Sequence, residues 1–221
     1  MSLIGLNREG YPYVFVPAAL AAIFGHFRKN RVALLSAATS LACAWFFRDP
    51  DRYPPYDREL ILSPADGKVI SIRRLEEKDW LETEVYRVSI FMNLLDVHVN
   101  RAPVTGRVLE IKHQSGAFLA ANKPEAYERN EKRYYLIERL DGLRLLTVQV
   151  AGLIARRTVP FIRAGDEILA GERLGMIRFG SRLEVFVPVE ETKLLVNIGH
   201  RVRAGETPLF WAPWRRKNDQ D

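Results

Sequence analysis

Two apolar runs separated by a short basic loop dominate the start of the chain. Residues 14–25 and 32–47 carry mostly apolar side chains, and the loop at residues 26–31 contains three arginine or lysine residues. Each run is shorter than the roughly 20 residues that an α-helix needs to cross a bilayer. The pattern predicts an apolar helical hairpin at residues 1–47 that lies shallowly in a membrane or on its surface. A hairpin buried in a protein core is the alternative interpretation.

A polar and proline-rich segment at residues 48–59 follows and predicts a linker. Beyond it, residues 60–221 alternate short β-branched or apolar stretches with Gly, Pro and Asp, a pattern typical of β-strands joined by tight turns. One clear helix is expected, at residues 117–129. The strands are expected at residues 68–72, 85–91, 106–111, 134–138, 144–150 and 183–187.

Two later segments resemble each other weakly. Residues 161–172 and 198–207 both contain Ala-Gly-Glu before a return strand. Such turns recur in small β-sandwiches of the biotinyl and lipoyl carrier type, where glycine accepts a positive φ. We therefore expect a mainly β (α+β) fold, a barrel-sandwich hybrid with one or two short helices after the apolar hairpin. The alternative is that glycine-rich hairpins occur in any all-β protein and say nothing more about the fold.

Composition narrows the classes of function. The formal charge is +6 with Lys and Arg spread along the chain, so an anionic lipid surface fits the charge as well as nucleic acid does. Cys43 is the only cysteine, which excludes an internal disulfide and a metal site built on thiolates. The four histidines are too scattered to suggest a metal cluster. We expect no metal site.

The segment with the most distinctive potential chemistry is Phe179-Gly180-Ser181-Arg182. A serine directly after a glycine follows an unhindered carbonyl, and glycine can adopt the strained backbone that exposes this carbonyl to the serine hydroxyl. Attack by the hydroxyl would move the acyl group from nitrogen to oxygen. Elimination and hydrolysis would then leave a pyruvoyl group with loss of ammonia. A Gly-Ser pair alone, however, is usually only a turn.

Two further segments carry polar groups in an informative pattern. In residues 96–100, alternation places Asp96, His98 and Asn100 on one face of an extended segment. A histidine there can titrate near neutral pH, although a structural, hydrogen-bonded histidine is the more common case. Asp66 lies in the turn at residues 63–67 and, taken alone, indicates an Asx turn.

Taken together and in this order, these motifs resemble those of phosphatidylserine decarboxylase proenzymes. The matching segments are residues 63–67, 96–106 and 175–182, and the similarity is closest to the short, archaeal-type branch of the family. The resemblance covers essentially the whole chain. It implies cleavage between Gly180 and Ser181 into residues 1–180 and 181–221, which stay together as an α/β heterodimer with a possible higher homo-oligomer.

The resemblance also implies roles for individual residues. Ser181 would become the pyruvoyl cofactor, which forms a Schiff base with the substrate amine, and Asp66 with His98 would form a charge relay that activates the Ser181 hydroxyl. His98 would also protonate the carbon left by carbon dioxide. Longer members carry a second histidine where this chain has Arg101. Either His98 serves both steps, or Arg101 replaces a general base with a fixed charge.

The function implied is conversion of phosphatidylserine to phosphatidylethanolamine at the cytoplasmic face of the cell membrane, with no nucleic-acid partner. Arg101, Arg156 and Arg157 are candidate contacts to the substrate, although a solvated basic pair is the alternative for the last two. A membrane-anchored lipoyl-type adaptor without catalysis is the alternative function. It would need a long coiled coil, and the chain has no sustained heptad run. A serine hydrolase would need a G-x-S-x-G elbow, which is absent around Ser181.

Overall fold

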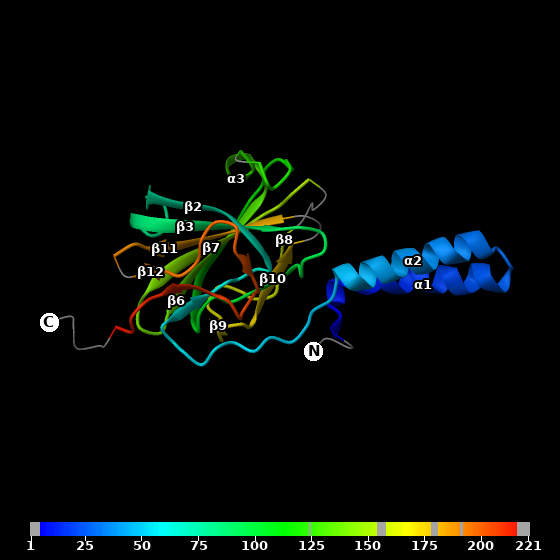
Figure 1. The fold of residues 1–221 in the computed structure, drawn as a ribbon, viewed down its shortest axis with the longest axis horizontal. Helices are drawn as coiled ribbons and strands as arrows, with labels where there is room; N and C mark the ends of the chain where they lie inside the picture. The colour runs from blue at the N-terminus through cyan, green and yellow to red at the C-terminus, as the bar shows by residue number, and fades with distance from the viewer. Residues whose placement is uncertain (1–4, 124, 154–157, 178–180, 191, 216–221) are drawn as a thin grey trace. The chain divides into compact units, whose positions relative to one another are not determined.

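The structure is a computed structural model that describes residues 5–123, 125–153, 158–177, 181–190 and 192–215. It divides into two compact units, Met1–Asp51 and Arg52–Asp221. The first unit is helical and the second is mainly β, as Figure 1 shows. The expectation of a mainly β fold with short helices after an apolar helical hairpin is confirmed.

The first unit is an antiparallel pair of helices. A short 3-10 helix, η2 (Arg8–Gly10), leads into α1 (Tyr11–His26), and α2 (Asn30–Phe46) returns beside it. The Ser40 hydroxyl of α2 donates to the Val14 carbonyl of α1 at 2.8 Å. At the open end, the Asn7 amide donates to the Phe47 carbonyl at 2.9 Å. These bonds hold the ends of the hairpin together.

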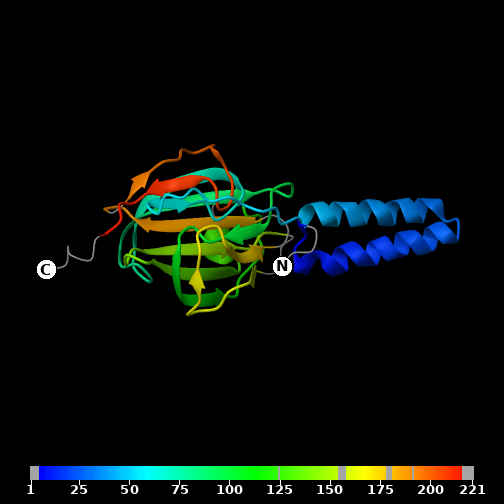
Figure 2. The same cartoon turned by 90° about the horizontal axis from the view of Figure 1, so that it is seen from below.

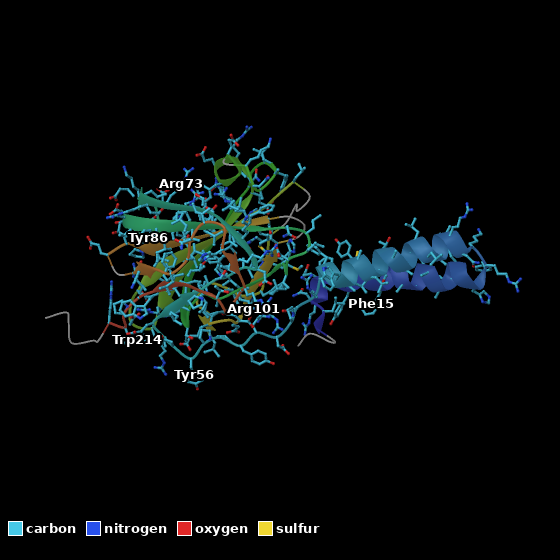
Figure 3. All side chains as sticks on the ribbon, in the orientation of Figure 1. Phe15, Tyr56, Arg73, Tyr86, Arg101 and Trp214 are labelled. Carbon is cyan, nitrogen blue, oxygen red and sulfur yellow. The ribbon has the colours of Figure 1, made fainter. Side chains whose placement is uncertain are left out.

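Both helices expose apolar side chains over much of their surface, and each has one partly buried seam at helical spacing. No residue of α1 is buried, and in α2 only Ser40 and Phe46 are. Large apolar side chains face outward along the pair, including Phe15, which Figure 3 labels, and Leu34 and Leu41. Among the described residues, no helix is long and apolar enough to cross a membrane.

The second unit is built on an antiparallel sheet that curls on itself, as Figure 2 shows. Within the described residues this sheet has eight strands in the order β13-β2-β3-β11-β7-β6-β5-β9. Their bounds are β13 (Arg201–Val202), β2 (Gly67–Glu77), β3 (Thr83–Met92), β11 (Ser181–Pro188), β7 (Arg144–Val150), β6 (Lys132–Arg139), β5 (Gly106–Gln114) and β9 (Glu167–Ile168).

Two smaller sheets and one short helix complete the second unit. One sheet joins β1 (Leu60–Leu62), β14 (Pro208–Trp211) and β12 (Lys193–Leu194), and the other joins β4 (Val99–Arg101), β10 (Arg173–Ile177) and β8 (Thr158–Pro160). The helix is α3 (Ala126–Arg129).

Strand β11 occupies a central position in the large sheet and is buried along its whole length. It pairs with β3 on one side and with β7 on the other. Alternate side chains enter two apolar clusters, with Leu183, Val185 and Val187 on one face and Phe186 on the other. The sheet therefore fixes the main chain that begins at Ser181.

The six strands expected from the sequence are confirmed, and most extend further than the pattern indicated. The helix expected at residues 117–129 is wrong in extent, since only Ala126–Arg129 is helical. The reason is that Asn130 competes for the main chain: its side chain accepts from the Leu119 amide and donates to the Leu119 carbonyl, both at 2.8 Å. The Ala117 amide likewise donates to the Arg129 carbonyl at 2.7 Å. These groups are therefore not available to a helix.

Candidate active site

Ser181 is the first residue of the central strand. It is fully buried and pairs with Met92 at the end of β3. Its hydroxyl donates to the Met92 sulfur at 3.3 Å. A thioether is a weak acceptor, so this contact holds the hydroxyl without engaging it strongly. Gly180 lies outside the described residues.

His98 lies beside the strand that leads toward Ser181. The His98 carbonyl accepts from the Ile177 amide, the last residue of β10, at 3.3 Å. The imidazole is fully buried, and its Nδ1 is 2.9 Å from the Asp96 main-chain oxygen. Because a carbonyl can only accept, Nδ1 carries a hydrogen, and whenever the ring is neutral its lone pair lies on Nε2. This tautomer suits a general base acting through Nε2.

A chain of buried amides ends at the same methionine. The Tyr135 hydroxyl donates to Gln149 Oε1 at 2.9 Å, and Gln149 Nε2 donates to Asn100 Oδ1 at 2.8 Å. Asn100 Nδ2 then contacts the Met92 sulfur at 3.7 Å. All four side chains are fully buried. This buried amide chain therefore runs through the interior from β6 to the sulfur that holds the Ser181 hydroxyl.

The direction of the buried amide chain is set at its first member. Burial is the largest effect on the Tyr135 phenol and raises its pKa above the usual value of 10.0. The hydroxyl is therefore protonated at neutral pH and can donate to Gln149. With Oε1 of Gln149 accepting, its nitrogen must face Asn100, and the Asn100 nitrogen then faces Met92.

Gly175 makes room for this chain. It pairs with Asn100 across the β10–β4 ladder. A Cβ atom at this position would lie 3.0 Å from the Tyr135 hydroxyl, 3.1 Å from Gln149 Nε2 and 2.6 Å from the Val159 carbonyl. Since real Cβ atoms almost never approach main-chain oxygen so closely, only glycine fits here.

Asp66 lies in a turn next to the strand that follows His98. The Arg101 amide of β4 donates to the Pro64 carbonyl of this turn at 2.9 Å. One oxygen of the Asp66 carboxylate accepts from Arg52 Nη2 at 2.7 Å, and the other accepts from the Ala204 amide at 2.8 Å. The Arg52 side chain is only 6% exposed, so this ion pair is well shielded from water. Asp66 therefore joins three segments that are distant in sequence.

The arginines singled out from the sequence differ in placement. Arg101 is buried, as Figure 3 shows within the second unit, and its Nη1 donates to the Gly171 carbonyl at 2.9 Å. A Cβ atom at Gly205, where φ is +73°, would lie 3.2 Å from the Arg101 Cδ. Arg156 and Arg157 lie outside the described residues.

Sequence reasoning missed Met92, Gln149 and Tyr135 as members of the site. It singled out Asn100 only as part of a polar strand face. Gln149 offers the clearest signal that could have been used, because it is a long polar side chain between two valines in the strand Arg144–Val150. A buried amide in such a strand needs a partner and often belongs to a network.

The sheet would hold residues 181–215 in place after a break before Ser181. β11 is bonded on both sides to strands from earlier in the chain, and β14 pairs with β1. Arg139, itself buried, donates to the Ala212 carbonyl at 3.0 Å and to the Pro213 carbonyl at 2.9 Å. The two parts therefore share a continuous core and need no peptide bond to stay associated.

Comparison with known proteins gives a consistent match. A family model described as phosphatidylserine decarboxylase matches residues 40–209. Relatives named phosphatidylserine decarboxylase proenzyme include one from Syntrophus aciditrophicus that is 48% identical, with 92% of this chain and 96% of the relative covered. Another, from Desulfotalea psychrophila, is 40% identical, with 93% of this chain and 96% of the relative covered. One from Nocardia farcinica is 43% identical, with 94% of this chain and 88% of the relative covered.

Proposed function

The chain belongs to the phosphatidylserine decarboxylase family, and we propose that it cuts itself before Ser181 and then converts phosphatidylserine to phosphatidylethanolamine and carbon dioxide. The observation that carries this proposal is the position of Ser181. It follows Gly180 and begins a central buried strand, and the preceding strand of the chain, β10, is hydrogen-bonded to His98 through the Ile177 amide.

In the self-cleavage step the Ser181 oxygen attacks the Gly180 carbonyl carbon, and the bond from that carbon to the Ser181 nitrogen breaks. His98 Nε2 accepts the hydroxyl proton and returns it to the departing nitrogen. Elimination then removes the Ser181 α-hydrogen and breaks the Cβ–O bond, which releases the Gly180 carboxylate and leaves dehydroalanine. A proton adds to Cβ as dehydroalanine becomes the imine, and water replaces the imine nitrogen, which leaves as ammonia, so that an α-keto group remains at residue 181.

The surroundings of Ser181 fit a pyruvoyl group. The position is fully buried, and its side chain meets an uncharged thioether. Such a group supplies a carbonyl that binds the substrate amine and withdraws electrons as carbon dioxide leaves. His98 supplies the proton to the substrate carbon, and the burial of both residues excludes water.

The remaining members of the site are positioning residues. The buried amide chain orients Asn100 and, through Met92, holds the residue 181 side chain. Asp66, held by Arg52 and the Ala204 amide, would influence His98 from the adjacent turn through its negative charge, because His98 Nδ1 is hydrogen-bonded to the Asp96 carbonyl and not to Asp66. Arg101 supplies a fixed charge where longer members carry a second histidine. That substitution, and the 96% coverage of the relatives from Syntrophus and Desulfotalea, support assignment to the short branch.

The helical hairpin associates the enzyme with its lipid substrate. Residues 1–47 would lie in the membrane surface, residues 48–59 would connect, and residues 60–221 would carry catalysis at the cytoplasmic face. Two helices that expose many large apolar side chains support this role, because such a surface is costly in water. Arg156 and Arg157 would contact the lipid phosphate, and the heterodimer of fragments could assemble further with copies of itself.

The test is release of carbon dioxide from vesicles that contain phosphatidylserine labelled in the serine carboxyl. Wild-type protein should release label and form phosphatidylethanolamine, while Ser181→Ala should do neither. Thr192→Ala is the matched control, because it removes a hydroxyl that donates to the Pro188 carbonyl at the far end of β11. Wild-type protein that shows no decarboxylation under these conditions would contradict the proposal.

A further inference from the structure

A pocket of about 340 Å³ opens on the outer face of the large sheet. Three arginines line it, Arg73 from β2, Arg87 from β3 and Arg182 from β11, and the segment around α3 supplies Tyr127, Glu125 and Glu128. Because Ser181 and Arg182 are consecutive in a strand, their side chains point to opposite faces. The pocket therefore lies on the opposite face of the strand from the Ser181 hydroxyl.

The floor of the pocket holds more positive than negative charge. Glu184 is fully buried and accepts from Arg87 at 3.0 and 3.3 Å and from the Ser89 hydroxyl at 2.6 Å, and it also pairs with Arg182. The Glu184 carboxylate is thus the shared counter-charge of two guanidinium groups, and the side chains of Arg87 and Arg182 are only 13% and 7% exposed. A buried charge without a counter-charge is costly, so this arrangement favours an added anion.

A neighbouring lysine increases the imbalance. Lys132 is buried, and its ammonium donates to the main-chain carbonyls of Tyr127 and Glu128 at 2.8 and 3.1 Å. These acceptors carry no net charge. The pKa of Lys132 is lowered, first by burial and then by the charge of Arg87. The cations behind the pocket therefore repel one another.

The rim has a different character from the floor. Arg73, which Figure 3 labels on β2, is exposed and extends the guanidinium surface to the mouth. Glu125 and Glu128 are exposed on the side of α3. Arg87 is fixed between them and the floor, because its guanidinium stacks on the Tyr127 ring at 3.6 Å. Cations thus line the depth of the pocket and carboxylates stand at its edge.

We infer that this pocket binds a phosphodiester that carries a primary ammonium group, with the phosphate on Arg73, Arg87 and Arg182 and the ammonium near Glu125 and Glu128. Guanidinium groups match phosphate oxygens in charge and geometry. The volume lies within the ~300–1,000 Å³ of small-molecule sites. The inference rests on the proposed function only for the expectation that such headgroups surround the enzyme, since binding here requires no catalysis.

The test uses the full-length Ser181→Ala protein, which cannot form the cofactor, titrated by calorimetry with glycerophosphoethanolamine. Saturable binding is expected. Arg73→Gln should weaken it about fivefold, the size expected for an exposed charge pair. Arg74→Gln is the matched control, because Arg74 is the next residue of β2, is 57% exposed and pairs with Glu84. Its affinity should equal that of the parent protein.

Inorganic phosphate serves as a second probe that lacks the ammonium. Glu128→Gln should weaken glycerophosphoethanolamine about fivefold and leave phosphate affinity unchanged or higher. Arg87→Lys keeps the positive charge but loses the planar pair of guanidinium donors, so it should weaken the binding of both probes.

Equal affinities of Arg73→Gln and Arg74→Gln for glycerophosphoethanolamine would overturn the site. Insensitivity of glycerophosphoethanolamine to Glu128→Gln would overturn the ammonium contact. Failure of the wild-type protein to cleave or decarboxylate would contradict the proposed function and leave these titrations interpretable.

Discussion

Replacing Asn100 with alanine tests whether the buried amide chain positions Ser181. The substitution removes the 2.8 Å bond from Gln149 Nε2 and the contact to the Met92 sulfur, at positions with no solvent exposure. A buried amide left without its acceptor costs about 1–3 kcal/mol. The free energy of unfolding should fall by that amount, as measured by chemical denaturation.

Self-cleavage should be slowed by more than the loss of stability explains. Met92 would no longer be held from the Asn100 side, and the Ser181 hydroxyl that it binds at 3.3 Å would lose its fixed direction. Misplacement of a reacting group by about 1 Å can cost ~10²-fold in rate. We expect maturation, followed by gel electrophoresis after cell-free synthesis, to slow by roughly that factor.

Asp141→Asn provides the matched control for stability. Asp141 accepts from Arg139 at 2.6 Å at the end of β6 opposite to the Ser181 end, and breaking this buried pair costs about 3 kcal/mol. The control should lose as much stability as Asn100→Ala and still mature at the wild-type rate. Equal maturation rates in the two variants would refute the positioning role and reduce Asn100 to a structural residue.

Three further outcomes are expected. His98→Ala should slow phosphatidylethanolamine formation by about 10²–10⁴-fold in a vesicle assay, and wild-type turnover would remove His98 from the mechanism. Burial opposes ionisation of Asp141, but hydrogen bonds from Arg139, Arg215 and Leu143 outweigh it and lower its pKa. Its stabilising effect is therefore present above the unfolded value of about 3.9 and lost as pH falls through the lower folded value, so the difference in melting temperature between wild type and Asp141→Asn should shrink below about pH 4. Deleting residues 1–47 should abolish co-sedimentation with anionic vesicles, and undiminished binding would exclude the hairpin as the anchor.

Long apolar runs and strands of regular alternation were predictable from the sequence. The helical hairpin was predictable because each of its two runs is long and mostly apolar. The strands around residues 85–91 and 144–150 were predictable because β-branched residues cluster there. Strands of two to five residues, such as β9 and β10, could not be predicted, because so few positions cannot show the alternation of apolar and polar side chains. The helix expected at residues 117–129 failed because Asn130 binds the main chain before it.

The site was predictable only where its members share a short motif. Ser181 and His98 stand in recognisable segments, but the partners of Asn100 and Asp66 come from distant strands and loops. Gln149 reaches Asn100 through the register of β7 in the sheet, and Ala204 reaches Asp66 through a turn far along the chain. Strand register and loop closure are properties of the folded chain, and local sequence does not encode them.

The most direct test of the account is an intact-mass spectrum of purified wild-type protein. We expect two polypeptides, residues 1–180 and a fragment from residue 181 onward whose first residue has lost its amino group and resists Edman degradation. A single unmodified polypeptide that still decarboxylates phosphatidylserine would contradict the account.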